Sequence, residues 1–280
     1  MKGKTVVITG ATSGIGEVAA VTLAGRGARI VMIARDRTRA EPVLARLSQV
    51  NPQVQHAVHY ADLSRLSEMK RVAAEIAASE PRIDVLVNNA GAMFSRRRET
   101  ADGLELTFAL NHMAYFVVTQ GLLERLKATP GARIISTASD AHKAASLDFD
   151  DLQWTRRRFA GFRVYGTSKL CNILFTRALT QRLAGTGVTA NCQHPGFVAT
   201  RFGDSSDGLL RQFFGLAKKI AAISPEAGAK TIVHLASSDE VAGKSGGYYT
   251  KCRLENPTKA AQDDAAAERL WAASEKIANG

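Results

Sequence analysis

The 280-residue sequence has few cysteines and no apolar run long enough to cross a bilayer. A membrane-spanning helix needs about 18 consecutive apolar residues, and the start of the chain also lacks the pattern of a secretory signal. The cysteines are scattered, with no C-x-x-C pair and no nearby histidine cluster, which argues against a disulfide framework and a zinc site. They are Cys171, Cys192 and Cys252. We therefore expect a cytoplasmic protein with no metal site and no transmembrane segment.

Internal repeats, low-complexity tracts and linkers are also missing, so we expect residues 1–280 to form a single domain. An apolar fraction of 45% is ample for a sizeable core. Short apolar runs alternate with helical patterns, which predicts a doubly wound α/β fold of the Rossmann type, a parallel sheet with helices on both faces. The runs lie near residues 54–60, 83–88, 132–138, 187–192 and 246–249. Asn256 is expected to N-cap a final helix, with Pro257 at its first position.

The sequence has fewer acidic than basic residues, 26 against 37, which gives a formal net charge of +11. This balance and two arginine triplets, at 96–98 and 156–158, superficially suggest a nucleic-acid partner. No recognition-helix, zinc-finger or RNA-binding motif accompanies the triplets, so we expect no nucleic-acid partner. A second hypothesis is that the triplets border a substrate entrance and attract acidic groups.

The N-terminal segment from Lys4 to Asp36 has the pattern of a strand, a glycine-rich turn, a helix and a second strand. Gly10, Gly14 and Gly16 allow the backbone to bend tightly and approach a pyrophosphate, while amides at the helix N-terminus face its charge. The spacing is Gly-x-x-x-Gly-x-Gly instead of the commoner G-x-G-x-x-G. Its setting between a strand and a helix still indicates nucleotide binding.

The end of the second strand bears on which dinucleotide is bound. An acidic residue there usually bonds the ribose 2′-hydroxyl of NAD, whereas an arginine accommodates the 2′-phosphate of NADP. Arg35 follows the strand and Arg37 and Arg39 come next, although Asp36 between them could serve a 2′-hydroxyl instead. We predict NADP (NADPH) as the cofactor and regard NAD as the less favoured alternative.

Tyr165 and Lys169 lie four residues apart in a helical stretch, which stacks their side chains on one face. An ammonium about 4 Å from a phenol is worth about 4 kcal/mol at an effective dielectric near 20, enough to lower the phenol pKa by about three units. This would bring the phenol toward the pH at which an acid/base catalyst works. Taken alone, the pair could equally be a chance surface pair.

Further motifs follow in order, namely Asp62 and Leu63 after the third strand, the NNAG segment at residues 88–91, and Pro195 and Gly196 after the sixth strand. Together they resemble the short-chain dehydrogenase/reductase family over nearly the whole chain. The resemblance implies a catalytic tetrad of Asn111, Ser139, Tyr165 and Lys169. It implies cofactor contacts from Gly10, Thr12, Ser13, Gly14, Ile15, Gly16, Arg35, Asp62, Leu63, Asn89, Ala90, Gly91, Tyr165, Lys169, Pro195, Gly196, Val198 and Thr200. Motifs of this number in the right order make a specific signal.

The implied chemistry is hydride transfer between nicotinamide and a carbonyl or alcohol substrate, with Tyr165 as general acid/base. By the same resemblance Lys169 bonds the nicotinamide ribose, Ser139 bonds the substrate oxygen and Asn111 holds a water in a proton path. The alternative is a redox sensor that binds NADP without turnover. Family members usually pair through two long helices, here near 101–127 and 163–185, which by analogy suggests a homodimer or homotetramer.

Two segments depart from the commonest family pattern. Between Ser139 and Tyr165 lies an extended insertion of 25 residues, which resembles the branch of retinol dehydrogenases and protochlorophyllide reductases and suggests a lipophilic aldehyde or ketone substrate. Residues 201–223 are amphipathic and basic, and we interpret them as a substrate lid, with a peripheral membrane contact as the alternative.

Overall fold

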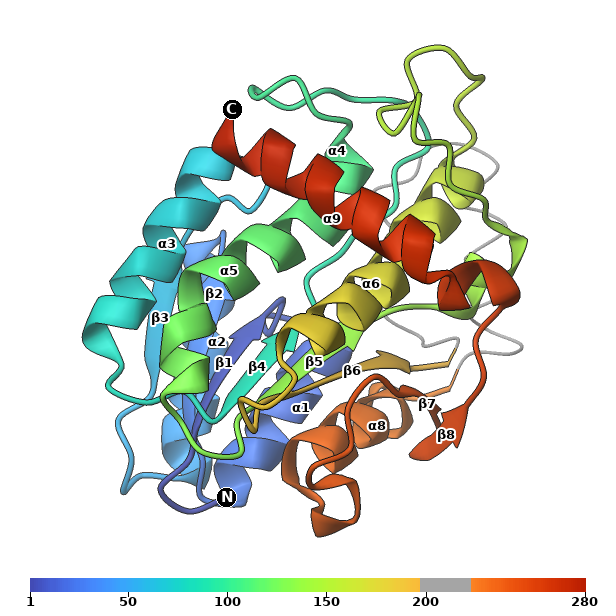
Figure 1. Cartoon of the computed structure of the whole chain (residues 1–280). Coiled ribbons are helices and arrows are strands. Elements are labelled where there is room, and N and C mark those ends of the chain that lie inside the picture. The colour runs from blue at the N-terminus through green and yellow to red at the C-terminus, as the bar shows by residue number, and fades with distance from the viewer. Residues whose placement is uncertain (197–222) are drawn as a thin grey trace.

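A computed structural model describes residues 1–196 and 223–280 and contains one sheet of eight strands. The strand order is β3-β2-β1-β4-β5-β6-β7-β8, and every neighbouring pair is parallel except β7 and β8 (Figure 1). The order changes direction between β1 and β4, which is where ligands bind in open α/β sheets. The strands are β1 (Thr5–Thr9), β2 (Arg29–Ala34), β3 (Ala57–Tyr60), β4 (Val85–Asn88), β5 (Arg133–Thr137), β6 (Thr189–His194), β7 (Tyr248–Thr250) and β8 (Arg253–Glu255).

Helices cover both faces of the sheet, which confirms the predicted fold class. α3, α5 and α6 lie on one face with α9 crossing outside them, and α1, α2 and α8 lie on the other (Figure 1). The α-helices are α1 (Gly14–Gly25), α2 (Arg37–Val50), α3 (Leu66–Ser79), α4 (Leu106–Phe108), α5 (Ala114–Lys127), α6 (Gly161–Arg182), α8 (Pro225–Ser237) and α9 (Asp264–Asn279). The shorter helical turns are the π-helix η1 (Ala109–Met113) and the 3₁₀ turns η2 (Asp140–Ala144), η3 (Asp239–Val241) and η4 (Lys259–Gln262).

The apolar strand residues divide between two hydrophobic cores. In β1, Val7 belongs to the core under α3, α5 and α6, while Val6 and Ile8 belong to the core under α1 and α8. All three side chains are fully buried. Burial of such a side chain stabilises the fold by about 1.5–3 kcal/mol, so a run of β-branched residues specifies a strand that is covered on both faces.

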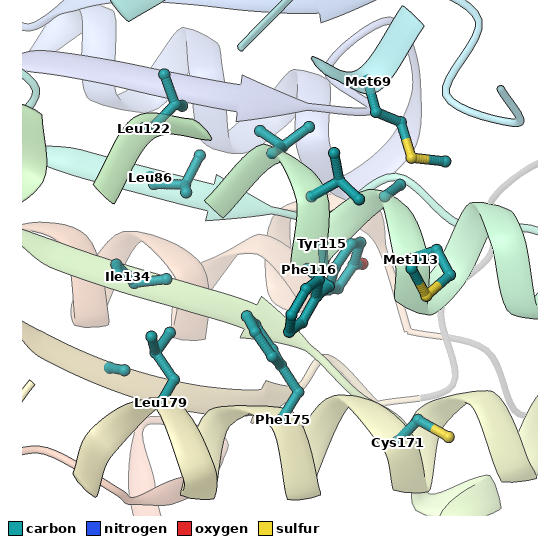
Figure 2. Close-up of a cluster of buried hydrophobic side chains, with 14 of the residues drawn as sticks. Met69, Leu86, Met113, Tyr115, Phe116, Leu122, Ile134, Cys171, Phe175 and Leu179 are labelled. Carbon is teal, nitrogen blue, oxygen red and sulfur yellow. The ribbon is translucent and has the colours of Figure 1, made fainter. Parts of the chain in front are cut away.

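Helix α9 is held on the outside of α5 and α6 by aromatic contacts. Figure 2 shows Phe116 of α5 and Phe175 of α6 in the core between these helices and the sheet. The Trp271 ring stacks on Phe175 at 5.9 Å between centroids and meets Phe116 edge-on at 5.0 Å. Arg182 lies over the same indole at 4.1 Å.

The C-terminal region differs from the sequence prediction at two points. The final helix begins at Asp264, and its N-cap is Asp263, whose carboxylate accepts from the Ala266 N–H, so the prediction of Asn256 as N-cap was wrong. Strand β8 was not predicted. The turn before it places Lys251 and Cys252 in the left-handed region, at φ 50° and 64°, without the Asn-Gly sequence that usually signals such a hairpin.

A buried histidine links the π-helix to α9. The Nε2 of His112 lies 2.8 Å from the Ser274 hydroxyl oxygen, and that hydroxyl donates to the Leu270 carbonyl. The serine oxygen therefore accepts, and His112 carries its proton on Nε2. Burial lowers the pKa of His112 to about 3. The imidazole thus stays neutral in the folded protein over most of the acidic range.

This burial should make the fold sensitive to acid. Below pH 6.5 the unfolded chain protonates His112 but the folded chain does not, so stability is lost as pH falls from about 6.5 to about 3. Between pH 7.5 and 5 we expect His112 to account for a loss of about 2 kcal/mol. Urea unfolding of wild type and His112→Gln at both pH values checks this, because Gln keeps a donor toward Ser274 without titrating. Equal losses in the two proteins would contradict it.

Candidate active site

A cavity of about 1280 Å³ opens beyond the carboxyl ends of the parallel strands. Its walls come from the segments that follow β1, β2, β3, β4, β5 and β6, together with one side of α6. This is the position where open α/β sheets bind ligands.

The glycine turn after β1 is shaped by a close approach to the end of β4. Gly10 has φ +68°, and a Cβ there would lie 2.8 Å from the Ala90 Cα. A Cβ on Gly16 would lie 2.2 Å from the Gly10 carbonyl oxygen. The Thr9 hydroxyl accepts from the backbone N–H groups of Asn89 and Ala90, both at 2.9 Å. The turn and the NNAG segment therefore form one packed unit that only glycine permits.

Helix α1 begins at this turn, at the wall of the cavity. Its N-cap, Ser13, makes no side-chain cap hydrogen bond, and Gly14 and Ile15 line the cavity. The first N–H groups of a helix have no partner within the helix and carry partial positive charge, so they suit a phosphate group.

At the far end of the cavity the acidic residue after β2 is engaged in capping. The Asp36 carboxylate accepts from the Thr38 hydroxyl at 2.7 Å and from the Arg39 N–H at 3.4 Å, which N-caps α2. The Thr38 bond lowers the pKa of Asp36. Arg35 is exposed, and Arg35 and Arg39 both line the cavity, whereas Arg37 lies over the Tyr60 ring.

Asn111 lies in the π-helix and fastens the loop after β4. Its Oδ1 accepts from the Ala92 N–H at 2.8 Å, and its Nδ2 donates to the Ala92 carbonyl and the Ser168 hydroxyl, both at 2.9 Å. A Cβ on Gly91 would lie 3.2 Å from the Asn111 Oδ1 and 3.4 Å from the Lys169 Nζ. The extra residue of a π-turn shifts the side-chain register, and such turns are frequent at functional sites.

Ser139 and Tyr165 meet at the carboxyl end of β5. Ser139 N-caps η2, where its hydroxyl oxygen accepts from the Ala141 N–H at 3.2 Å. Tyr165 is only 8% exposed. Burial raises the pKa of Tyr165 well above its usual range, and a hydrogen bond with the Ser139 side chain opposes that rise. The phenol therefore keeps its proton at neutral pH.

The ammonium of Lys169 is aimed at the sheet. Its Nζ donates to the Thr137 carbonyl at 2.9 Å and lies 5.6 Å from the centroid of the Tyr165 ring. Lys169 is 2% exposed, and burial lowers its pKa to about 8. The net pKa of Tyr165 is therefore raised by burial, not lowered as predicted, and the group that opposes this rise is Ser139.

Most of the predicted site residues lie on the cavity. Asn111 and Gly16 support its wall from behind, and Val198, Thr200 and nearly all of the predicted 201–223 lid lie outside the described residues. The predicted residues that line it are Gly10, Thr12, Ser13, Gly14, Ile15, Arg35, Asp62, Leu63, Asn89, Ala90, Gly91, Ser139, Tyr165, Lys169, Pro195 and Gly196.

Sequence reasoning missed several other lining residues, namely Phe94, Leu110, Thr137, Asp140, Lys143, Phe162 and His194. Asp140 and His194 could have been found, because each is next to a predicted residue at a strand end. Phe94 and Leu110 carried no such signal, since their position depends on how the loop after β4 packs.

The middle residue of each arginine triplet is structural. Arg97 donates to the Gln153 carbonyl at 3.0 Å and pairs with Glu99, which ties the loop after β4 to the insertion. Arg157 lies 4.0 Å from the centroid of the Trp154 ring and pairs with the buried Asp151. These contacts account for one member of each triplet within the fold.

Comparison with known proteins decides the family. The family model described as short chain dehydrogenase matches residues 4–207. The chain belongs to the short-chain dehydrogenase family. It is similar to Retinol dehydrogenase 13 from Homo sapiens, with 38% identity over 98% of this chain and 84% of the relative. It is similar to Retinol dehydrogenase 14 from Homo sapiens, with 39% identity over 98% of this chain and 86% of the relative.

Solved structures of short-chain dehydrogenases share the fold. An uncharacterized protein from Mycobacterium paratuberculosis superposes with a TM-score of 0.79 at 30% identity, over 99% of this chain and 94% of that one. A short-chain dehydrogenase from Burkholderia cenocepacia in complex with NADP gives a TM-score of 0.69 at 25% identity, over 89% of this chain and 96% of that one.

This short-chain dehydrogenase is therefore an oxidoreductase that acts on CH–OH groups, and it lies in the branch of the retinol dehydrogenases. The family fold binds a nicotinamide cofactor and acts on small molecules. Within residues 1–196 and 223–280, no helix has the length and apolar character that a bilayer crossing demands.

The contact between the glycine turn and β4 can be tested with one substitution. Gly10→Ala should lower the free energy of unfolding by about 1–3 kcal/mol more than Gly3→Ala, because a Cβ at Gly10 meets backbone atoms. Gly3 is a matched control, since it has φ +73° and nothing within 4 Å of a built Cβ. Denaturant unfolding measures both losses. Equal losses would mean that left-handed strain alone matters at Gly10.

Proposed function

We propose that this chain is an NADP-dependent oxidoreductase that transfers a hydride between nicotinamide and a carbonyl or alcohol substrate, with Tyr165 as the general acid/base. The supporting observation is that Ser139, Tyr165 and Lys169 converge in the cavity that the glycine turn also lines. In this proposal residues 1–280 act as a single dinucleotide-binding domain. Cytoplasmic localisation and pairing into a homodimer or homotetramer stay predictions.

The cavity residues fit a dinucleotide with a 2′-phosphate. The first amides of α1, at Gly14 and Ile15, would hold the pyrophosphate. Arg35 and Arg39 would hold the 2′-phosphate, while Asp36 is engaged in capping α2 and is poorly placed to bond a 2′-hydroxyl. Several related structures are NADP complexes, which also supports NADP over NAD. When bound, the cofactor supplies or accepts the hydride.

The protonated phenol is the form of Tyr165 that carbonyl reduction requires. Burial raises the pKa of Tyr165, so the hydroxyl carries a proton that it can donate to an oxygen developing negative charge. Ser139 would hold that oxygen beside the phenol. Lys169, a cation below pH of about 8, would orient the ribose and add positive charge near the reacting oxygen. The redox-sensor alternative explains none of this arrangement.

Three large apolar side chains contribute to the wall of the cavity. Phe94, Leu110 and Phe162 line it, and Phe162 is 49% exposed at its edge. Aromatic and aliphatic walls suit a lipophilic aldehyde or ketone. The retinol dehydrogenase relatives agree with a lipophilic substrate class.

Replacement of the phenol hydroxyl tests the central role. Tyr165→Phe should lower kcat for aldehyde reduction by at least about 10²-fold while the Kd for NADPH changes little, because the lost group donates a proton. Tyr249→Phe is the matched control, since Tyr249 is also buried but packs in the core under α1 and α8. NADPH absorbance with a panel of aldehydes gives the rates. A Tyr165→Phe protein that keeps most of its rate would refute the assignment.

Cofactor preference can be tested at the adenosine end. Arg35→Ala should weaken NADPH binding by about 10- to 100-fold and leave NADH binding almost unchanged, because a charged hydrogen bond is worth about 1.5–3 kcal/mol. Arg37→Ala is the control, since Arg37 lies over Tyr60 and pairs with Glu41 instead of lining the cavity. Fluorescence titration measures the affinities of wild type and both variants for the two nucleotides. Equal loss for both nucleotides would argue against a 2′-phosphate contact.

A further inference from the structure

The peptide bond that follows Ser139 is held at its carbonyl by His142. The Nδ1 of His142 lies 2.7 Å from the Ser139 carbonyl oxygen, which can only accept, so Nδ1 carries the proton. The Nε2 of the same ring lies 3.4 Å from the Thr258 backbone nitrogen, whose N–H donates to it. Both ring nitrogens are therefore used, and this pattern requires a neutral imidazole with its proton on Nδ1.

The other side of the same peptide bond is held by His194. The Asp140 N–H donates to the Nδ1 of His194 at 3.3 Å, so this nitrogen carries no proton. The proton of a neutral ring is then on Nε2, which lies 3.7 Å from the Asp140 carboxylate. His194 is 8% exposed and His142 is fully buried. The two histidines, in opposite tautomers, therefore hydrogen-bond to the carbonyl and to the N–H of the same peptide group.

We propose that His142 and His194 are positioning residues that fix the Ser139–Asp140 peptide, and through it the Ser139 hydroxyl, and that the His194 contact holds only while its imidazole is neutral. The proposal rests on the proposed function for its catalytic consequence. Ser139 bonds Tyr165 and the Ala141 N–H, so rotation of the next peptide would misdirect its hydroxyl. His194 directly precedes Pro195 and Gly196, so the same contact joins two walls of the cavity.

The charged surroundings of the two rings are mixed. The Asp140 carboxylate accepts from Lys143 at 2.9 Å and from the Tyr248 hydroxyl at 3.1 Å, and the Tyr248 ring packs against His142. Burial lowers the pKa of both histidines, Asp140 opposes this effect and Lys143 adds to it. The charge of His142 also lowers the pKa of His194, and the charge of Glu255 raises the pKa of His194.

Protonation would break each contact in a defined way. If the Nδ1 of His194 were protonated, it would become a donor opposite the Asp140 N–H, and that hydrogen bond would be lost. A proton on the Nε2 of His142 would do the same to the Thr258 N–H. Because burial keeps both rings neutral at pH 6.5, the positioning should fail only as pH falls further below that value.

Variants at His194 separate positioning from general packing. His194→Leu should lower kcat for aldehyde reduction by about 3- to 10-fold at pH 7.5, the loss expected from one hydrogen bond, with little change in the Kd for NADPH. His194→Asn should recover most of this loss, because its Oδ1 can accept from the Asp140 N–H. It should also flatten the fall in kcat below pH 6.5, since Asn does not titrate.

His56→Asn is the matched control for these profiles. His56 is also buried, its Nδ1 accepts from the Ile30 N–H at 3.0 Å, and burial likewise lowers its pKa, but it lies outside the cavity. The fall in kcat below pH 6.5 should be the same in His56→Asn as in wild type. A His194→Leu protein with wild-type kcat, or a His194→Asn protein with the wild-type fall in kcat below pH 6.5, would overturn the proposal.

Nitrogen-15 NMR gives a readout that does not depend on turnover. At pH 7.5 the imidazole shifts should show His142 with its proton on Nδ1 and His194 with its proton on Nε2, and the protection factor of the Asp140 amide against hydrogen exchange should decrease as pH falls. The same tautomer in both rings would overturn the proposal. If the tautomers agree but wild type reduces no aldehyde or ketone, the proposed function fails while the holding of the peptide by two histidines is upheld.

Discussion

The candidate site depends on the buried Lys169 ammonium and the Thr137 carbonyl that accepts from it. The Asn172 amide donates to the same carbonyl at 3.1 Å, so α6 is fastened to the end of β5 by two bonds. Loss of the acceptor would leave a buried charge without compensation, which costs several kcal/mol. The Thr137 hydroxyl also accepts from Gln193 and donates to Asn89. One residue therefore aligns α6 with the ends of β4 and β6.

Features that depend on neighbours along the chain could be predicted from the sequence. The β-branched runs and the turn from Gly10 to Gly16 belong to this class, because strand pattern and glycine geometry are local. The final helix could not be placed correctly, since Asn256 and Asp263 are both good N-caps and the choice depends on where Trp271 docks. The π-helix around Asn111 had no signal either, because its register is set by contacts with the loop after β4.

The electrostatic prediction at Tyr165 shows why spacing is a poor guide to pKa. Spacing along a helix predicted proximity to Lys169, but it contained no information about burial or about the other partners of the ammonium. In the folded chain Lys169 donates to Thr137, and the Tyr165 ring is almost fully covered. Desolvation then acts on both groups at once, because it raises the pKa of the phenol and lowers that of the amine, each toward its neutral form.

These opposing shifts restrict the pH range in which the groups of the site are compatible. Lys169 is a cation only below pH of about 8, whereas His194 accepts from the Asp140 N–H only while its ring is neutral, a state that burial extends below pH 6.5. Tyr165 is protonated throughout this range. A charged lysine, a protonated phenol and two neutral imidazoles therefore coexist around neutral pH, and a protonated phenol is the form that proton donation to a carbonyl oxygen requires.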